Sequence, residues 1–222
     1  IGMFSIGEIP TGSRDPFALR RAVNGLIKIA INHSIPLNFS VLIDQLSTLY
    51  PATKEYKSAI ESFIIDRLSG VYPAVNPSII SSVVGKTPSV ELSVLELDAK
   101  IRAVDTIASS EGFSDAFSTF KRVSNILKDV SMEREFNVDP SLFDNSYETQ
   151  LYSEFTATIN KEYSSLEERL DALFGLKNQL DLFFENVMVN AENLQVKSNR
   201  QSLIGMIYAE IYAIADIKNI TL

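Results

Sequence analysis

Apolar residues recur every three or four positions along almost the whole chain, and this spacing constrains the fold more than any other feature of the sequence. No alternating strand pattern competes with it, although the opening stretch MFSIGEIP is compatible with an extended conformation. The sequence therefore predicts an all-α protein with short connections. The expected helices cover residues 15–32, 40–49, 53–68, 77–84, 90–108, 113–130, 147–162, 166–187 and 196–217.

Capping signals mark several of these helix starts. A capping side chain precedes a proline, which is tolerated in the first helical turn, at Asp15–Pro16, Asn76–Pro77 and Asp139–Pro140. Ser165 and Glu168 have the spacing of a capping box. The stretch GKTPSV, residues 85–90, is the best candidate for a linker. We expect a smaller helical body segment over residues 1–109, followed by a helical bundle over residues 110–222.

The residues that usually carry catalysis or bind metals are scarce. The 222 residues include one histidine and no cysteine, which excludes disulfides, thiolate metal sites and cysteine nucleophiles. The histidine, His33, is expected to interact favourably with a helix C-terminus rather than to act in catalysis. Carboxylate pairs such as Glu167–Glu168 are expected on solvated surfaces, and no glycine-rich phosphate loop follows a strand. We therefore predict no catalytic residue, no metal site and no cofactor in this chain.

The hydropathy, the cysteine content and the first residues of the chain bear on its location and on whether it is part of a longer protein. No run of about 18 uncharged apolar residues appears, so no membrane partner is expected. The lack of cysteine is compatible with a reducing cytosol, which favours a cytoplasmic location. The chain opens IGMF, with neither an initiator methionine nor a signal peptide pattern, and we expect it to be a piece of a longer protein.

Three local clusters of basic and polar residues stand out in a chain whose net charge of −8 opposes unspecific binding to polyanions. The first is GSRDPFALRRAVNGLIKI, residues 12–29. If this stretch is helical, Arg21, Asn24 and Lys28 form one polar stripe opposite an apolar face. Such a stripe suits phosphate contacts, and it is equally compatible with an ordinary solvated face.

The second cluster is FKRVSNILK, residues 120–128. Lys121, Asn125 and Lys128 share a helix face at i, i+4 and i+7, and Arg122 flanks it. No acidic residue occurs within the stretch. Lysine and arginine commonly contact phosphates, and an asparagine amide can hydrogen-bond a base edge. The alternative interpretation is again a solvated surface.

The third cluster is FFENVMVNAENLQVKSNRQSL, residues 183–203, in which two helices are joined by a turn rich in asparagine. Asparagine is common in caps and turns. A polar turn between two rigid helices can also present side chains such as Asn190, together with Arg200 from the following helix, to an unstacked nucleotide.

These three stretches closely resemble the bacterial glycyl-tRNA synthetase beta subunit, in the same order and at similar separations. The resemblance extends from Gly2 to about Ile214 and is weakest over residues 36–110. It implies a DALR-type anticodon-binding domain over residues 110–222, and it makes the chain the C-terminal part of such a subunit. In that family a separate alpha subunit activates glycine with ATP, and the two subunits form a heterotetramer. The resemblance therefore implies tRNA(Gly) and the alpha subunit as partners, with ATP used by the whole enzyme and a non-catalytic role for this part.

The family resemblance does not assign individual contacts, so the predicted tRNA-binding residues follow from side-chain chemistry and helix facing. They are Lys121, Arg122, Asn125, Lys128, Asn190 and Arg200 for the anticodon, and Arg21 and Lys28 for the tRNA backbone or for holding the body segment together. Three alternatives stay open: a structural or subunit-interaction domain that binds no RNA, an unrelated helical scaffold, and an arginyl-type DALR domain. The DPFALRR and VMVNA stretches match the glycyl type better than the arginyl type.

Overall fold

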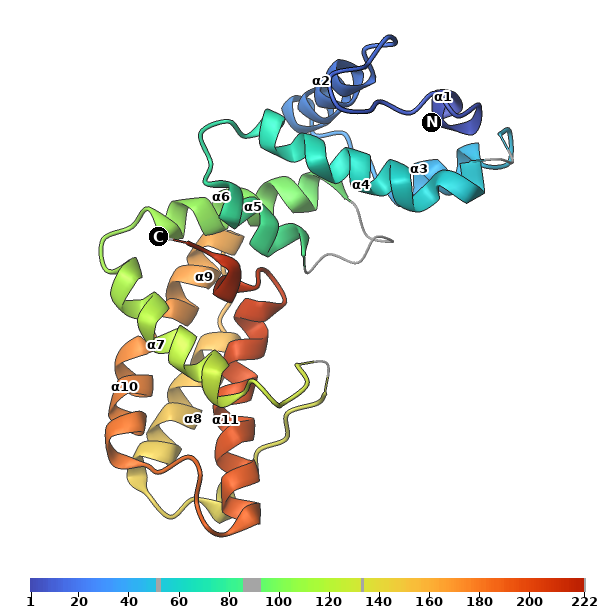
Figure 1. Cartoon of the computed structure of the whole chain (residues 1–222). Helices are drawn as coiled ribbons and strands as arrows, with labels where there is room; N and C mark the ends of the chain where they lie inside the picture. Colours follow the sequence, from blue (N-terminus) through green and yellow to red (C-terminus); the bar gives the residue numbers. More distant parts are fainter. Residues whose placement is uncertain (51–52, 86–92, 133, 222) are drawn as a thin grey trace. The chain divides into compact units, whose positions relative to one another are not determined.

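The computed structural model describes residues 1–50, 53–85, 93–132 and 134–221, and it confirms the predicted all-α class. The described residues form no β-sheet; isolated β-bridges join Thr11 to Arg14 and Asn38 to Ser93. The helices, shown in Figure 1, are α1 (Gly2–Ser5), α2 (Leu19–Asn32), α3 (Phe39–Leu46), α4 (Thr53–Val71), α5 (Pro77–Val84), α6 (Val94–Ala108), α7 (Phe113–Ile126), η2 (Pro140–Leu142), α8 (Ser146–Ile159), α9 (Leu166–Phe174), α10 (Lys177–Asn186), α11 (Leu194–Tyr212) and η3 (Ile217–Asn219).

The chain divides into two compact units, unit 1 from Ile1 to Ile101 and unit 2 from Arg102 to Leu222, and the division falls inside α6. None of the described helices is long and apolar enough to cross a membrane. The expected roles of segments 1–109 and 110–222, as a body segment and an anticodon-binding domain, stay predictions.

Helix α4 is the centre of unit 1, because it contacts α1, α2, α3 and α5. Ile60, Ile64 and Leu68 recur every four residues along α4 and are all buried. Helix α2 contributes the buried Ile27 and Ala30. The core of unit 1 therefore follows the helical periodicity of its sequence.

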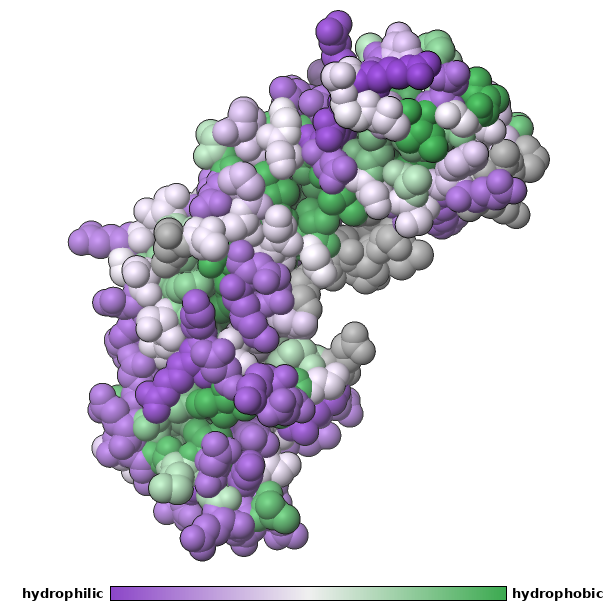
Figure 2. Space-filling view, viewed as in Figure 1, coloured by the Kyte–Doolittle hydropathy of each residue, from purple (hydrophilic) through white to green (hydrophobic). Residues whose placement is uncertain are grey.

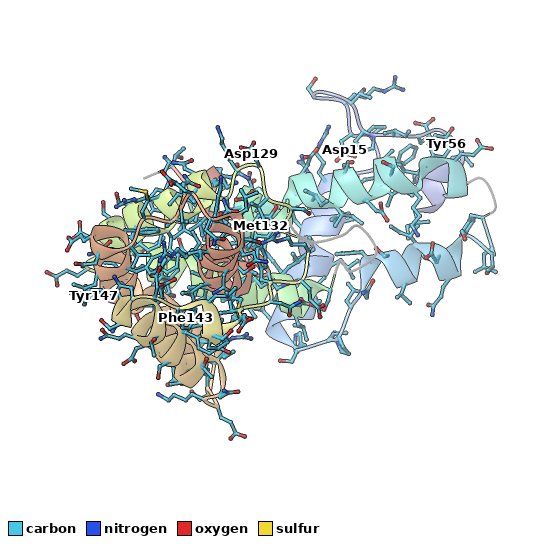
Figure 3. The ribbon with its side chains drawn as sticks, turned by 90° about the horizontal axis from the view of Figure 1, so that it is seen from below. Asp15, Tyr56, Asp129, Met132, Phe143 and Tyr147 are labelled. Atoms are coloured by element: carbon cyan, nitrogen blue, oxygen red, sulfur yellow. The ribbon has the colours of Figure 1, made fainter. Side chains whose placement is uncertain are left out.

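Helix α2 differs from its prediction in where it begins. It starts at Leu19 rather than directly after Asp15. The Asp15 carboxylate, labelled in Figure 3, still caps the helix, because it accepts hydrogen bonds from the backbone N–H groups of Leu19 at 2.8 Å and Arg20 at 3.0 Å. Between Asp15 and Leu19 the chain turns at Ala18, whose φ is 54°. The prediction that Asp15 and Pro16 begin the helix was therefore wrong, because Ala18 holds the N-cap position, although the Asp15 carboxylate does accept from the first turn.

The predicted polar stripe of α2 was wrong for Asn24. The backbone of Gly70 on α4 approaches this side chain so closely that a Cβ at position 70 would lie 2.8 Å from Asn24 Nδ2. Leu26 is 40% exposed, although it is apolar and belongs to the same helix. Contact with α4 has selected a face of α2 centred on Ile27 and Ala30, which includes Asn24 and leaves Leu26 outside.

In unit 2, α7 packs against α9, α10 and α11, while α8 packs against α9, α10 and α11 (Figure 1). Aromatic rings join α7 to α9: the ring of Phe174 lies edge-on to those of Phe120, at 5.0 Å between centroids, and Phe113, at 5.5 Å. Such edge-to-face pairs stabilise more than their buried area alone. This aromatic core fixes which side of α7 faces inward.

The single helix predicted over residues 166–187 is two helices, α9 and α10. Gly175 ends α9, and its N–H donates to the carbonyl of Asp171 at 2.8 Å. A Cβ at position 175 would lie 3.2 Å from the carbonyl oxygen of Ala172, so the close turn uses the glycine. The apolar spacing continues across the turn because Leu176 and Leu180 are both buried, which is why periodicity alone did not reveal the break.

Other local predictions had mixed outcomes. The Asn76 cap is confirmed, with its Oδ1 accepting from the N–H of Ser78 at 2.9 Å. The Ser165 hydroxyl accepts from the N–H of Glu168 as expected, but the Glu168 carboxylate returns to the N–H of Ser164. Asp139–Pro140 opens the short 3-10 helix η2, and the beginning of MFSIGEIP, expected to be extended, belongs to helix α1. Of the predicted linker, only Gly85 falls among the described residues.

The connection between α7 and η2 runs along α11. The amide of Asn199 on α11 accepts from the N–H of Asp139 at 2.8 Å and donates to the carbonyl of the same residue at 3.0 Å. Farther along α11, the ring of Phe136 lies against the bare backbone of Gly205. These contacts place the chain that follows α7 beside the middle of α11, from Asn199 to Gly205.

Candidate nucleic-acid interface

A groove of about 810 Å³ lies in unit 2, where the end of α7 approaches the loop before α11 and the first turns of α11. Asp129, labelled in Figure 3 with Met132, comes from the segment that follows α7. Hydrophilic side chains cover most of the face of unit 2 seen in Figure 2. The groove is lined by Ser118, Lys121, Arg122, Asn125, Ile126, Lys128, Asp129, Val130, Asn190, Lys197 and Gln201.

The packing of α7 explains why its basic residues face this groove. Phe120 and Val123 of the helix are fully buried, and Leu127 just after it is nearly so. Residues offset from these positions around the helix must then point outward. Lys121, Arg122, Asn125 and Lys128 are all exposed and line the groove.

The groove is basic, although the chain as a whole is acidic. Its lining has four cationic side chains, Lys121, Arg122, Lys128 and Lys197, and one carboxylate, that of Asp129. None of these four cations makes a side-chain hydrogen bond or ion pair with another described residue. Clustered cations raise the local concentration of anions, and cations without a protein partner are free to bind them.

Cations elsewhere in unit 2 provide the contrast. Lys177 pairs with Asp181 at 2.7 Å, Arg169 pairs with Glu210, and Arg200 pairs with Glu148. Arg134, Lys161 and Lys218, which lie outside the groove, make no ion pair with a described carboxylate either. The groove differs in that four such cations line one surface.

Arg122 has an additional contact that the sequence did not reveal. Its guanidinium carbon lies 4.4 Å from the centroid of the Phe184 ring on α10, within the range of a cation–π interaction. Lys121 is more distant from its nearest ring, with Nζ at 5.6 Å from the Phe117 centroid. Phe184 is 8% exposed and belongs to the core, and nothing in the sequence indicated that its ring also supports a groove residue.

Two further groove residues, Lys197 and Gln201, were missing from the prediction. They lie four positions apart on α11 and therefore face the same side of that helix. The spacing was readable in the sequence. The missing information was which face of α11 turns toward α7.

Arg200 does not reach the groove, and its predicted role as a base reader does not fit its position. It is 7% exposed, and all three guanidinium nitrogens already donate. Nε donates to Glu148 Oε1 at 2.9 Å, Nη1 to the carbonyl of Met188 at 3.1 Å, and Nη2 to both Glu148 and Asp144. The hydrogen bond to Glu148, together with the negative charges of Glu148 and Asp144, raises the pKa of the Arg200 guanidinium. Arg200 is therefore buried in ion pairs with Glu148 and Asp144 that hold the structure together.

The structural role of Arg200 nevertheless bears on the groove. Its bond to the carbonyl of Met188 holds the loop that carries Asn190, and Asn190 is an exposed lining residue. Asn145, at the start of α8, donates to the carbonyl of Asn186 at 3.4 Å. The loop between α10 and α11 is thus fixed from two helices.

Arg21 and Lys28 lie elsewhere in the chain. Both are exposed on α2 in unit 1, whereas the groove is built from residues of unit 2. Beside them, Leu26 and Ile29 are also exposed, the latter at 53%. The described residues include no group of three or more histidine, aspartate and glutamate side chains placed to hold a metal ion.

Comparison with known proteins identifies one family. The sequence model described as "Glycyl-tRNA synthetase beta subunit" matches residues 1–85. The glycine–tRNA ligase beta subunit of Helicobacter pylori (strain Shi470) is 32% identical over 228 residues, which cover 99% of this chain and 32% of the relative. Those of Janthinobacterium sp. (strain Marseille) and Pasteurella multocida (strain Pm70) are 33% and 32% identical, covering 99% and 97% of this chain and 32% of each relative.

The chain therefore spans about a third of the length of the relatives that it matches. The similarity runs through both units, since it covers nearly all of the sequence. By this evidence the chain belongs to the glycyl-tRNA synthetase beta subunit family.

Proposed function

We propose that the groove of unit 2 binds the anticodon region of tRNA(Gly) while glycine is attached to the tRNA. One observation carries this proposal: four cations that make no hydrogen bond or ion pair with a described residue line a groove in an acidic chain of this family. Lysine and arginine suit the phosphates of an RNA loop, and such contacts set its position.

The amides of the groove supply the chemistry for reading bases. Asn125, Asn190 and Gln201 each present a donor and an acceptor, and none makes a side-chain hydrogen bond with a described residue. Glycine anticodons have cytosines at their second and third positions. Cytosine offers an N4 donor beside its N3 and O2 acceptors, so an amide can complement its edge once the base leaves the stack.

The rest of the reaction is proposed to lie outside this chain. An alpha subunit would activate glycine with ATP, and the beta subunit would hold the tRNA in a cytosolic complex of both subunits. We assign no catalytic residue, metal or cofactor to the chain itself.

A second role is proposed for unit 1. Leu26 and Ile29 are three positions apart on α2 and leave apolar surface exposed beside Arg21 and Lys28. Exposed apolar patches rimmed by polar residues mark surfaces that pack against another protein. Unit 1 would then serve subunit interaction while unit 2 binds RNA.

The experiment that tests the groove is titration of the chain with a tRNA(Gly) anticodon stem-loop over a range of salt concentrations. A stem-loop with both cytosines replaced is the RNA control. We expect Lys121→Ala to weaken binding and to lower the slope of log K against log salt by about 1, because one phosphate contact is lost. Lys161→Ala is the matched protein control, since Lys161 is exposed but does not line the groove.

The outcomes separate the alternatives. Preference for the native loop supports base reading, whereas equal affinity for both loops would leave only backbone contacts. If no stem-loop binds, or if Lys161→Ala weakens binding as much as Lys121→Ala, the groove is not the RNA site of this chain.

A further inference from the structure

Arg122 is held over an aromatic ring that is itself supported from the core. The ring of Phe184 is 8% exposed and lies 5.7 Å from that of Phe183, at an angle of 61° between the planes. Phe183 is fully buried. Because Phe183 and the bundle behind it are closely packed, Phe184 cannot retreat, and the Arg122 guanidinium 4.4 Å away rests on a fixed surface.

The charged group of Arg122 is otherwise unengaged. No N–H of its guanidinium donates to another described residue, and the side chain is exposed and lines the groove. A guanidinium is planar, so a ring on one side leaves its other side open for a second planar group. Nucleobases taken out of a stack commonly pack on such planes.

We propose that Arg122, supported by Phe184, is a stacking platform for one unstacked nucleobase in the groove. This inference rests on the proposed RNA-binding function and adds a specific contact to it. Asn125 follows Arg122 by three positions on α7 and lines the same groove, so its amide stands where the edge of a stacked base can be read. Lys121 and Lys128 hold the phosphates on either side.

Stacking and charge attraction are distinguished by Arg122→Lys, which keeps the positive charge and removes the planar group. We expect about tenfold weaker binding of the anticodon stem-loop, comparable with the loss of one base-stacking contact. The salt dependence of binding should stay as in the original chain, because the charge is conserved. Binding of a continuous RNA duplex with the same stem sequence should not change, because it has no unstacked base.

Lys121→Arg is the matched control. Lys121 is the neighbouring exposed groove residue. Its change to arginine also keeps the positive charge, but it replaces an ammonium group by a guanidinium, which is the reverse of Arg122→Lys. We expect this variant to bind the stem-loop within about twofold of the original chain, since an exposed phosphate contact tolerates either cation.

Phe184→Leu tests the support beneath the platform. It keeps Arg122 and its charge but removes the ring, and we expect a similar loss of stem-loop affinity. Combining it with Arg122→Lys should cost little more than either change alone, because both remove one platform. Thermal unfolding of each variant separates loss of the platform from loss of the fold.

Three results would overturn the platform while leaving RNA binding intact. They are full stem-loop affinity in Arg122→Lys, an equal loss for duplex and stem-loop, and undiminished binding by Arg122→Ala, in which case the base would not need the guanidinium. Failure of the original chain to bind any stem-loop would instead refute the proposed function, and the platform with it.

Discussion

At the scale of single residues, burial decides what a charged or polar side chain can do. Arg122 and Arg200 are chemically identical, yet Arg122 is exposed over a ring in the groove and Arg200 is buried among three acceptors. A buried cation must be paired, because an unpaired charge in the interior is very costly. Only the exposed arginine is therefore free for a ligand.

Tyr208 provides a prediction about pH. Its ring is 1% exposed, and burial, with a smaller effect of the charge on Asp216, raises the pKa of its phenol well above the ordinary value of about 10. Above about pH 10, the phenol of Tyr208 loses its proton in the unfolded chain but keeps it in the folded chain. The free energy of unfolding should therefore fall from about pH 10 upward, while the contribution of Tyr208 is complete below it.

Urea unfolding of the original chain and of Tyr208→Phe at about pH 8 and about pH 11 measures this effect. We expect the original chain to lose more stability between the two values than the variant, because phenylalanine cannot ionise. The other tyrosines and the lysines contribute equally to both proteins. An identical loss in both would show that Tyr208 ionises as easily in the folded state as in the unfolded one.

At the scale of elements, helix ends and loops in unit 2 are held by side chains from distant parts of the sequence. The Glu148 side chain is fully buried, accepts from the backbone N–H groups of Asp144 and Asn145, and pairs with Arg200. It thereby caps α8 and connects that helix to α11. Through the carbonyl of Met188, the same arginine also holds the loop before α11.

Breaking this pair should be more harmful than neutralising it. Arg200→Met leaves the buried Glu148 carboxylate without its cation, and we expect a loss of about 3–5 kcal/mol in the free energy of unfolding. Adding Glu148→Gln should recover part of this loss, because the amide oxygen can still accept from the backbone and carries no charge. Urea denaturation measures the free energy of unfolding of the single and the double variant. A double variant less stable than Arg200→Met would contradict the explanation.

The contact of the α7–η2 connection with α11 gives a second prediction at this scale. A Cβ added at Gly205 would lie 2.3 Å from the ring of Phe136, so Gly205→Ala must displace that ring. In the middle of a helix, alanine is otherwise favoured over glycine by about 1 kcal/mol. We expect Gly205→Ala to be stabilising in a Phe136→Ala background and to lose that gain when Phe136 is present.

Thermal unfolding of the two single variants and the double variant forms a complete cycle for Gly205 and Phe136. A substantial coupling energy would show that the ring packs on the bare backbone of α11. Equal effects of Gly205→Ala in both backgrounds would mean that the connection does not depend on this contact.

At the scale of the whole molecule, the groove and its support lie within unit 2. The lining residues run from Ser118 to Gln201, and the aromatic core beneath α7 comes from α7, α9 and α10. Unit 1 has its own core around α4. RNA binding through the groove should therefore depend on unit 2 and not on unit 1.

A shortened chain of residues 94–222, which keeps α6 whole, tests this independence. We expect it to unfold in one cooperative transition and to bind the anticodon stem-loop within a few-fold of the full chain, because every groove residue is retained. Circular dichroism during urea unfolding and the same RNA titration provide the measurements. Cooperative folding with lost affinity would mean that unit 1 contributes to the RNA site.

The sequence by itself determined the features that depend on local spacing. Helical periodicity predicted the all-α class, and local capping chemistry predicted the cap at Asn76. The same periodicity predicted that Lys121 and Asn125 share one exposed face of α7, because the apolar residues between them have to be buried. Lys128, expected on the same face, is exposed but follows the end of α7 at Ile126. These predictions succeeded because they concern residues within two helical turns of one another.

Tertiary structure alone decided which surfaces meet. Arg200 pairs with Glu148, 52 positions earlier in the chain, and Asn199 holds Asp139, 60 positions earlier. Likewise, Asn24 faces Gly70 and Arg122 rests on Phe184 because separate helices pack together. Periodicity shows that a helix has an apolar side, but it does not show what covers that side. The pairing of Arg200 with Glu148 and the ring beneath Arg122 could not be read from the sequence for this same physical reason.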